Sequence, residues 1–302
     1  MTSTAAVVVS FNTRELLRSC LAAVTREPAA EIVVVDNRSS DGSREMVRRE
    51  FPSVTLVANT RNVGYGEAAN RGLASCRAPY VLLLNADTRP GPGSLEALSC
   101  FLDRHPDAAA VGPRLLNADG TLQPSCLPFP GSLRLCLEKT ILGRWRYRAH
   151  DRPRSVPWIV GAAMALRREA IDSVGGFDPA FFMYAEEVDL CFRLRKRGWR
   201  VHFTPDASVT HVGGASTEPL RAAMAVRRVR SVRLFYRRHY PRLQCAALDA
   251  AIRSTMACRW LRDVARRSMS RDPATRSRLT EDIGVWLDLL VDGRAEGEPS
   301  ES

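Results

Sequence analysis

Three carboxylates stand close together in the stretch "YAEEVDL", at Glu186, Glu187 and Asp189. On a helix, Glu186 and Asp189 would share a face, whereas Glu187 would point about a hundred degrees away. Asp189 can pair with Arg193 four residues on, but Glu187 has no cation at helical spacing. A carboxylate without a local cation, beside groups that raise its pKa, is suited to accept a proton. We predict Glu187 as a general base, Glu186 as the alternative, and Asp189 as a structural helix charge.

A second set of residues could hold a divalent cation. The apolar run "YVLLLNAD" ends in Asn85 and Asp87, whose side chains lie on the same face because they are two positions apart on a strand. A carboxylate oxygen there can hold a hard cation against a diphosphate, although a turn or a helix cap would also explain Asp87. His211 follows the strand-like "ASVTH". It is a second ligand if it converges with Asp87, and otherwise a hydrogen-bonded loop histidine.

Asp36 ends another apolar run, "EIVVVD". Its carboxylate can accept a hydrogen bond from a pyrimidine N3–H or a ribose hydroxyl, and an Asx turn is an equal alternative. Gly64 and Gly66 suit a close backbone approach to phosphate, but such short glycine spacings are common. Neither a Walker A lysine motif nor G-x-G-x-x-G occurs, which disfavours NTPases and dinucleotide-dependent dehydrogenases.

The elements that must position these residues alternate along the chain. Apolar runs at 5–12, 31–36, 53–60 and 80–87 predict strands, and helical patterns lie at 14–26 and 66–76. After a loosely patterned stretch from 107 to 157, read as loops and short elements, a strand and helix (158–178), a helix (185–197) and a strand (200–214) follow. This order predicts an α/β fold with a mainly parallel sheet buried on both faces. Ligands of such sheets bind beyond the carboxyl ends of the strands.

The chain has 302 residues and a net charge of +11, and residues 221–267 contain thirteen Arg against two Asp, which accounts for that whole excess. We divide it into a catalytic domain (1–218), a basic helical extension (219–290) and a disordered tail (291–302). Arg alternates with apolar residues in "AVRRVRSVRLFYRRHY", so the extension can lie on an anionic membrane or pack against the catalytic domain. No nucleic-acid-binding module accompanies the charge, so no nucleic-acid partner is expected.

Eight scattered cysteines without a C-x-x-C pair indicate buried thiols in a reducing compartment. The amino terminus lacks the basic segment of a secretory signal, and no apolar run is long enough to span a bilayer. The expected location is cytoplasmic, peripheral on the inner face of the cell membrane if the extension binds lipid.

Several of these motifs together carry a resemblance. The stretches "VVVSFN", "IVVVDNRSSDGS", "NTRNVGYGEAANRGL", "YVLLLNADT", "VGPRLLNADGTLQPS", "GGFDPAFFMYAEEVDLCFRL" and "VTHVGGAS" resemble the inverting family 2 glycosyltransferases of the GT-A (nucleotide-diphospho-sugar transferase) fold, in the bacterial rhamnosyltransferase-like branch. The match covers roughly residues 5 to 216 in the family's order. It is specific for the fold and the reaction class and much less so for the sugar.

The resemblance implies roles for individual residues. Asp36 would bind the base beside Ser10, Phe11 and Asn12. The ribose and diphosphate would lie near Asn62, Gly64, Asn70, Asn85 and Ala86, and the metal, Mg²⁺ or Mn²⁺, would lie on Asp87 with His211. Glu187 stands where the family has its catalytic Asp. Trp158, Gly161 and Asp178 would shape the acceptor side, where Trp158 is as readily a core residue as a ring that stacks on sugar.

The implied reaction is attack of an acceptor hydroxyl on the anomeric carbon of a dTDP-, UDP- or GDP-sugar, with inversion and loss of the nucleoside diphosphate. A deoxyhexose such as L-rhamnose is the expected sugar, and a glycan, a glycolipid or a polyprenyl-diphosphate-linked sugar the expected acceptor. Two alternatives stay open. One is a natural-product glycosyltransferase with a small-molecule acceptor, and the other is a catalytically silent homologue that binds nucleotide sugar or membrane.

Overall fold

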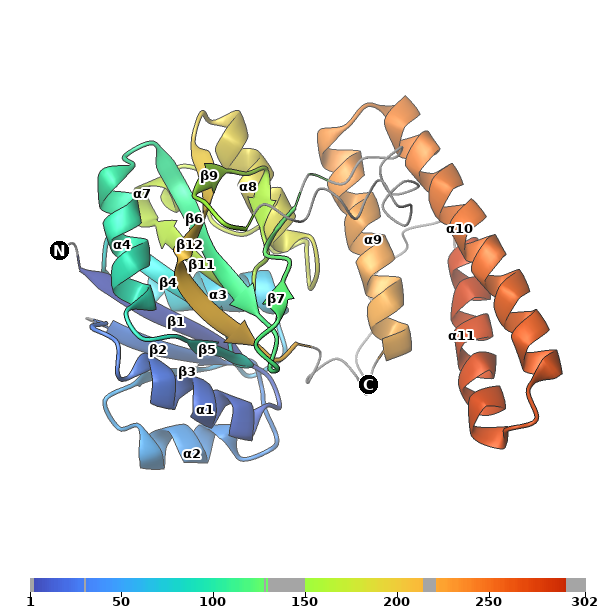
Figure 1. Ribbon diagram of the computed structural model, residues 1–302, viewed down its shortest axis with the longest axis horizontal. Helices are drawn as coiled ribbons and strands as arrows, with labels where there is room; N and C mark the ends of the chain where they lie inside the picture. The colour runs from blue at the N-terminus through green and yellow to red at the C-terminus, as the bar shows by residue number, and fades with distance from the viewer. Residues whose placement is uncertain (1–2, 30, 128, 130–149, 214–220, 292–302) are drawn as a thin grey trace. The chain divides into compact units, whose positions relative to one another are not determined.

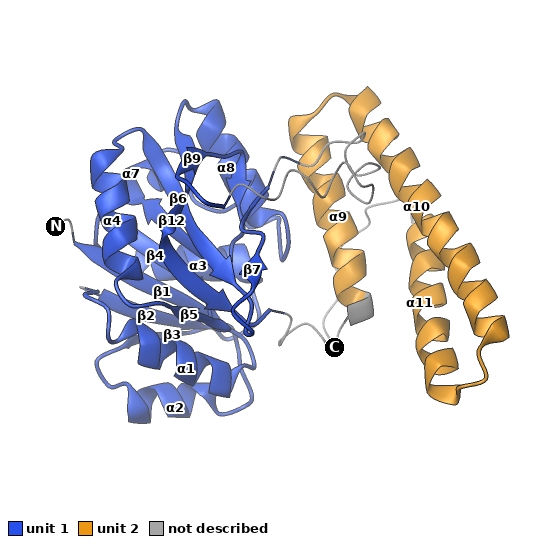
Figure 2. Cartoon of the chain, viewed as in Figure 1, with its two compact units in different colours: residues 1–129, 141–216 blue, residues 130–140, 217–302 orange. Residues whose placement is uncertain are grey.

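The computed structural model describes residues 3–29, 31–127, 129, 150–213 and 221–291. The chain divides into two compact units, the first holding the described residues up to 213 and the second those from 221 onward (Figure 2). The expected boundary at 218/219 and almost all of the tail 291–302 lie outside the described residues.

The first unit is built on one large sheet (Figure 1). Its strands follow the order β3-β2-β1-β4-β11-β6-β12-β5, with β7 beside β6 and β9 beside β12. A small separate sheet joins β8 to β10. The strands are β1 (Thr4–Ser10), β2 (Glu31–Asp36), β3 (Thr55–Ala58), β4 (Tyr80–Asn85), β5 (Thr88–Pro90), β6 (Ala108–Leu116), β7 (Leu122–Gln123), β8 (Cys126–Leu127), β9 (Arg154–Ser155), β10 (Trp158–Ile159), β11 (Ala163–Arg167) and β12 (Arg200–His211).

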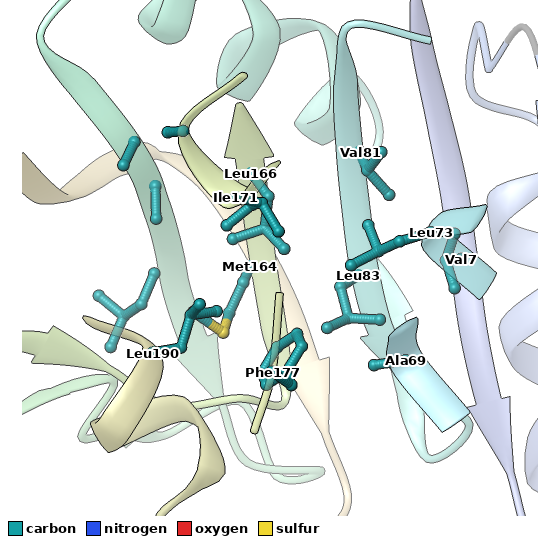
Figure 3. Packing of buried hydrophobic residues seen from close by; sticks show 14 of the residues in the cluster. Val7, Ala69, Leu73, Val81, Leu83, Met164, Leu166, Ile171, Phe177 and Leu190 are labelled. Atoms are coloured by element: carbon teal, nitrogen blue, oxygen red, sulfur yellow. The ribbon is translucent and has the colours of Figure 1, made fainter. Parts of the chain in front are cut away.

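Helices cover both faces of this sheet. α1 (Arg14–Val24), α2 (Ser43–Glu50) and α4 (Ser94–Arg104) pack on one face, and α3 (Tyr65–Ala74), α7 (Arg168–Asp172) and α8 (Glu186–Lys196) on the other. Because alternate residues of a strand face opposite sides, Val7 joins one core and Val8 the other. Figure 3 shows the core that contains Val7, where Leu73 of α3 and Leu83 of β4 lie together. The predicted α/β sheet buried on both faces is therefore confirmed.

The direction of the strands brings the polar strand ends to one edge. β1 pairs in parallel with β2 and β4, and β12 in parallel with β6. β11 is antiparallel to both β4 and β6, so β4 and β6 run in the same direction. The carboxyl ends of β1, β2, β4, β6 and β12 therefore lie along a single edge, where the predicted site residues gather.

The interpretation of 107–157 as loops and short elements was wrong in its first part. Residues 108–116, "AAAVGPRLL", form β6, a nine-residue strand inside the sheet. Alanine and proline weaken the sequence pattern of a strand, but burial and pairing with β11 on one side and β12 on the other override that weakness here. Residues 130–149 of the same stretch lie outside the described part.

Residues 221–291 of the second unit form three helices, where the sequence indicated one long basic helical region. They are α9 (Arg221–His239), α10 (Arg242–Met269) and α11 (Pro273–Val291), and they pack on one another. Arg233 of α9 is largely buried and its Nε donates to Asp249 of α10 at 2.8 Å. Trp286 of α11 donates from Nε1 to the buried Asp263 of α10 at 3.0 Å. Among the described residues, no helix is both long and apolar enough to cross a membrane.

Candidate active site

Asp36 lies at the carboxyl end of β2 and is 1% exposed. Its Oδ1 accepts a hydrogen bond from the backbone N–H of Ser39 at 3.0 Å and an ion-paired hydrogen bond from Arg44. Its Oδ2 is buried and has no hydrogen-bond partner. The Asx-type turn and a ligand role are therefore compatible, because the turn uses one oxygen and leaves the other. A buried carboxylate oxygen without a donor is costly unless a ligand supplies one.

The loop that precedes α3 is fixed by a buried amide, Asn37. Its Nδ2 donates to Asn62 Oδ1 at 2.7 Å, and its Oδ1 accepts from Asn59 Nδ2 and from the backbone N–H of Val63. Gly64 has a φ of +83°, and a Cβ at this position would lie 2.3 Å from the carbonyl oxygen of Phe182. Only glycine fits there. Asn62 and Gly64 thus shape the backbone beside Asp36. The sequence analysis did not predict a role for Asn37.

Asp87 and His211 converge at the edge of the sheet, as the ligand hypothesis requires. His211 Nε2 lies 3.5 Å from Asp87 Oδ1, and both side chains are mostly buried. His211 Nδ1 lies 2.7 Å from Gln123 Oε1, and Gln123 Nε2 donates to Asn117 Oδ1 at 2.9 Å. Gln123 Oε1 can only accept a hydrogen bond, so this network places a proton on Nδ1; in the neutral form of the ring, Nε2 would then present its lone pair to the carboxylate.

A lone pair and a carboxylate oxygen that face each other favour a cation between them. Asn85 adds a second oxygen at this edge, since its Oδ1 is buried and has no hydrogen-bond partner. These residues fit a divalent cation. In the described part of the chain, no three His, Cys, Asp or Glu side chains come together as a metal cluster.

Tyr65 links this edge to the predicted base. It is the first residue of α3, its hydroxyl donates to the carbonyl oxygen of Gly161 at 3.1 Å, and it is half-buried against the core that contains Val7. The pKa of Tyr65 is raised well above its ordinary value, first by burial and then by the negative charges of Glu186, Glu187 and Asp87. The Asp87 carboxylate and the paired glutamates therefore lie within electrostatic reach of one phenol.

Glu186 and Glu187 begin α8. Glu186 is 7% exposed and its Oε2 has no hydrogen-bond partner. Burial, with the adjacent Glu187, raises the pKa of Glu186 well above its ordinary value. Glu187 lies beside Gly161, where a Cβ added to the glycine would stand 3.5 Å from Glu187 Cβ. The Oε2 of each glutamate is buried, and Glu187 packs its side chain against Gly161.

Asp189 forms the ion pair expected from its spacing. It is 1% exposed and accepts from Arg193 Nε at 2.6 Å. The other guanidinium nitrogens of Arg193 donate to the carbonyl oxygens of Val174 and Gly176. This pair ties α8 to the loop before it, so its geometry favours the structural alternative for Asp189 over catalysis.

Asn70 is the one predicted ribose neighbour whose contacts point elsewhere. Its Nδ2 donates to the carbonyl oxygen of Phe177 and its Oδ1 accepts from the Phe177 backbone N–H, each at 2.8 Å. This double contact fixes the "GGFD" loop on α3 and favours a structural role. Asp178 in the same loop accepts a hydrogen bond from the backbone N–H of Ala180 at 3.0 Å. This contact is one that a residue stabilising the loop would make.

Of the remaining predicted residues, Ser10 ends β1, Ala86 follows β4, and Trp158 begins β10 in the small sheet. Ser10 is buried and its hydroxyl lies 3.1 Å from that of Thr13, while Phe11 is half-buried. Asn12 is exposed and accepts from the Ser40 backbone N–H at 2.8 Å. Ala86 and Trp158 each pack against a core.

The sequence reasoning missed four residues that hold the site: Arg44, Asn37, Tyr65 and Gln123. Three of them, Asn37, Tyr65 and Gln123, lie within the stretches that carried the family resemblance, so their place there was the available indication. Arg44 stands one residue beyond such a stretch, eight residues after Asp36, where the helix that follows β2 returns it to the carboxylate.

Solved structures identify the fold. The chain is similar to the mannosyltransferase PcManGT from Pyrobaculum calidifontis in complex with GDP-Man and Mn²⁺, with a TM-score of 0.59, 18% identity and coverage of 97% of this chain and 88% of that one. The architecture is that of a GT-A glycosyltransferase, the class that the sheet and its polar edge define.

The sequence comparisons give the family. The profile described as "Glycosyltransferase like family 2" matches residues 2–233, and the chain belongs to this family of enzymes. It is 31% identical over 281 residues to the N-acetylglucosaminyl-diphospho-decaprenol L-rhamnosyltransferase of Mycobacterium tuberculosis, covering 85% of this chain and 91% of the relative. It is also 24% identical to the dTDP-rhamnosyl transferase RfbF of Shigella flexneri, with 69% of each covered.

Proposed function

We propose that the chain is an inverting, metal-dependent glycosyltransferase that moves a deoxyhexose, L-rhamnose, from a nucleotide diphosphate donor to a hydroxyl of a lipid-linked glycan. The observation that carries the proposal is the convergence at one sheet edge of Asp36, the Asp87–His211 pair and the paired glutamates around Tyr65. The names of the two rhamnosyltransferase relatives support the sugar, and the name of the first supports a polyprenyl-diphosphate acceptor.

Asp36 would receive the base of the donor. Its buried Oδ2 accepts no hydrogen bond within the protein, so it can accept one from the N3–H of a pyrimidine such as the thymine of dTDP-rhamnose. Arg44 and Ser39 hold Oδ1 and so set the direction in which Oδ2 points. A charged acceptor held in place strengthens such a hydrogen bond.

Asp87 and His211 would hold Mg²⁺ or Mn²⁺, with Gln123 orienting the imidazole. When bound, the cation neutralises charge that develops on the diphosphate as it leaves. The orphaned Oδ1 of Asn85 would accept from a ribose hydroxyl or from a water at this site.

Glu187 would take the proton of the attacking hydroxyl. Its place beside Gly161 puts it next to the loop that the Tyr65 hydroxyl fixes. Burial raises the pKa of Glu186 well above its ordinary value and so favours its protonated form, and a carboxyl that already holds a proton would not accept one from the hydroxyl. Direct displacement with one base inverts the anomeric carbon, and no covalent enzyme intermediate forms.

The test is transfer itself. The purified chain would be incubated with dTDP-L-rhamnose, UDP-glucose or GDP-mannose, with Mn²⁺ or Mg²⁺, and with a polyprenyl-diphosphate-linked N-acetylglucosamine. We expect release of dTDP and a rhamnosylated lipid only from the first donor, and no product once EDTA has removed the metal. Product from a different donor would change the sugar assignment, and acceptor-independent release alone would contradict the transferase assignment.

The proposed acceptor is embedded in a membrane, so the enzyme would work at the inner membrane surface as a peripheral protein. The basic second unit is the part of the chain whose charge suits that location.

A further inference from the structure

The outward face of α10 carries an apolar stripe. Leu243, Leu261, Val264 and Met269 are 81%, 61%, 38% and 78% exposed. Only six large hydrophobic side chains are exposed in the described part of the chain, and these four share one helix. Such clustering is not the scattered exposure that soluble surfaces ordinarily show.

Helix geometry places these residues on one side of α10, with Val264 and Met269 about 60° and 80° to either side of the line through Leu243 and Leu261. Leu243 and Leu261 are separated by five whole turns of about 3.6 residues, so they lie on the same side of α10. The exposed positions between and beside them on this side are small or apolar: Ala246, Ala247, Ala250, Ser254, Cys258, Ala265 and Ser268. The buried residues Leu248, Ile252 and Met256 recur every four positions on the opposite side. The stripe is therefore distinct from the face that packs in the helical unit, and it extends for about 39 Å at about 1.5 Å per residue.

Arginines border the stripe on both sides. Arg242, Arg253 and Arg267 follow one edge, and Arg262 and Arg266 follow the other, at the spacing of about 3.6 residues per turn. All five are exposed. An apolar stripe between two rows of cations is the pattern of a helix that lies in a membrane interface, with its apolar side among the acyl chains and its cations at the headgroups.

The charge identifies the partner as an anionic lipid surface. The two acidic residues of α10, Asp249 and Asp263, already pair with Arg233 and Arg262 within the unit. A second copy of α10 would therefore bring arginine against arginine. A nucleic acid would satisfy the arginines but leave the leucines against a polar backbone. Anionic lipid supplies both phosphates for the arginines and hydrocarbon for the stripe.

We propose that the outward face of α10, defined by Leu243, Leu261, Val264, Met269 and the bordering arginines, docks the enzyme on an anionic bilayer as an interfacial helix. The benefit of membrane docking to the enzyme rests on the proposed function, in which the acceptor is lipid-linked. Binding of α10 to the bilayer needs neither the sugar donor nor transfer. A failure of transfer would therefore leave the docking result intact, and the reverse also holds.

Sedimentation of the full chain with vesicles tests the proposal, without donor, metal or acceptor. We expect binding to phosphatidylcholine vesicles that contain phosphatidylglycerol, little binding to phosphatidylcholine alone, and weaker binding as salt rises. The double variant Leu243→Gln and Leu261→Gln keeps every charge and should bind at least about tenfold more weakly, because two apolar side chains no longer enter the hydrocarbon. The double variant Arg253→Gln and Arg267→Gln should also bind more weakly and depend less on salt.

Matched changes in the first unit are the controls. Leu122→Gln removes an exposed leucine, and Arg48→Gln with Arg104→Gln removes two exposed arginines, so vesicle binding should stay as in the wild type. Circular dichroism would verify the helix content of every variant. Equal binding to both vesicle types, or wild-type binding by the leucine variant, would overturn the proposal. A wild-type dimer in light scattering that the leucine variant splits would assign the stripe to a second copy instead.

Discussion

Replacing Gln123 by leucine would test whether His211 is a metal ligand without touching either proposed ligand. Gln123 Oε1 lies 2.7 Å from His211 Nδ1 and holds the ring with Nε2 toward Asp87. Leucine has a similar size but accepts no hydrogen bond. The imidazole then loses its fixed orientation and its preferred tautomer.

The expected size follows from the role of such outer contacts. Loss of the partner that orients a metal-bound histidine weakens metal affinity by about 10–100-fold, equal to about 1.4–2.8 kcal/mol. We expect the Mn²⁺ concentration for half-maximal transfer to rise by that factor in Gln123→Leu. The rate at saturating Mn²⁺ should fall much less. Gln123→Glu should keep activation near the wild-type value, because a carboxylate also accepts from Nδ1–H.

Titration of transfer activity with Mn²⁺ measures this effect. Asn117→Ala is the matched control, since Asn117 contacts the amide nitrogen of Gln123 and leaves Oε1 on the histidine. Calorimetric binding of Mn²⁺ in the presence of dTDP gives a second readout that needs no turnover. An unchanged activation constant in Gln123→Leu, beside a loss of activation in Asp87→Asn, would refute His211 as a ligand.

Four other predictions concern the carboxylates. Glu187→Gln should lower kcat by about 10²–10⁴-fold, with Glu186→Gln less severe, in dTDP-release assays. Asp36→Asn should weaken dTDP binding about tenfold in calorimetry, because a charged acceptor becomes neutral. Asp189→Asn should lower the free energy of unfolding by about 3 kcal/mol in urea, since it leaves the charge of Arg193 without its partner. Burial raises the pKa of Glu186, so the folded chain keeps a proton that the unfolded chain releases. The free energy of unfolding therefore falls as pH rises above about 4.5. Glu186→Gln should remove this fall in thermal melts recorded without metal.

Each of these has a contrary result. Near-normal kcat in Glu187→Gln would remove it as the base, and full dTDP affinity in Asp36→Asn would remove its contact with the nucleotide. Asp189→Asn with wild-type stability would contradict a bracing role, and its kcat measured at low temperature would separate stability from chemistry. Parallel pH dependence of melting in wild type and Glu186→Gln would mean that another group titrates.

The fold could be predicted where local pattern and burial agree. β1, β2 and β4 are unbroken runs of β-branched and leucine residues, and each ends at a polar residue, so both the strands and their carboxyl ends were readable. β6 was missed because "AAAVGPRLL" owes its strand state to neighbours that lie far away along the chain. The breaks between α9, α10 and α11 fall at Pro241 and near Pro273. These prolines are local signals of helix ends, but the sequence analysis treated the whole region as one element because arginine recurs throughout it.

The site could be predicted only in part, for a related reason. Asp36 and His211 end strands and Asp87 follows the end of β4 by two residues, so the direction of the sheet brings them to the same edge. Which of their atoms remain open depends on partners such as Arg44 and Gln123 that come from other elements. Asn70 illustrates the limit, because its motif suggests a ligand contact while a loop more than a hundred residues away occupies its amide. Spacing locates a functional group, but tertiary contacts decide whether it is available.

The properties of Glu186 and Glu187 depend more on their surroundings than on their spacing in the sequence. The family resemblance places an aspartate where this chain has Glu187, and the longer side chain needs room for one more methylene. The Glu187 side chain packs along Gly161, where an added Cβ would lie 3.5, 3.6 and 3.7 Å from Glu187 Cβ, Cγ and Cδ, within ordinary contact distance. Burial and the charge of Glu187 raise the pKa of Glu186 well above its ordinary value. A raised pKa favours the neutral form of Glu186, which relieves the repulsion between two adjacent carboxylates.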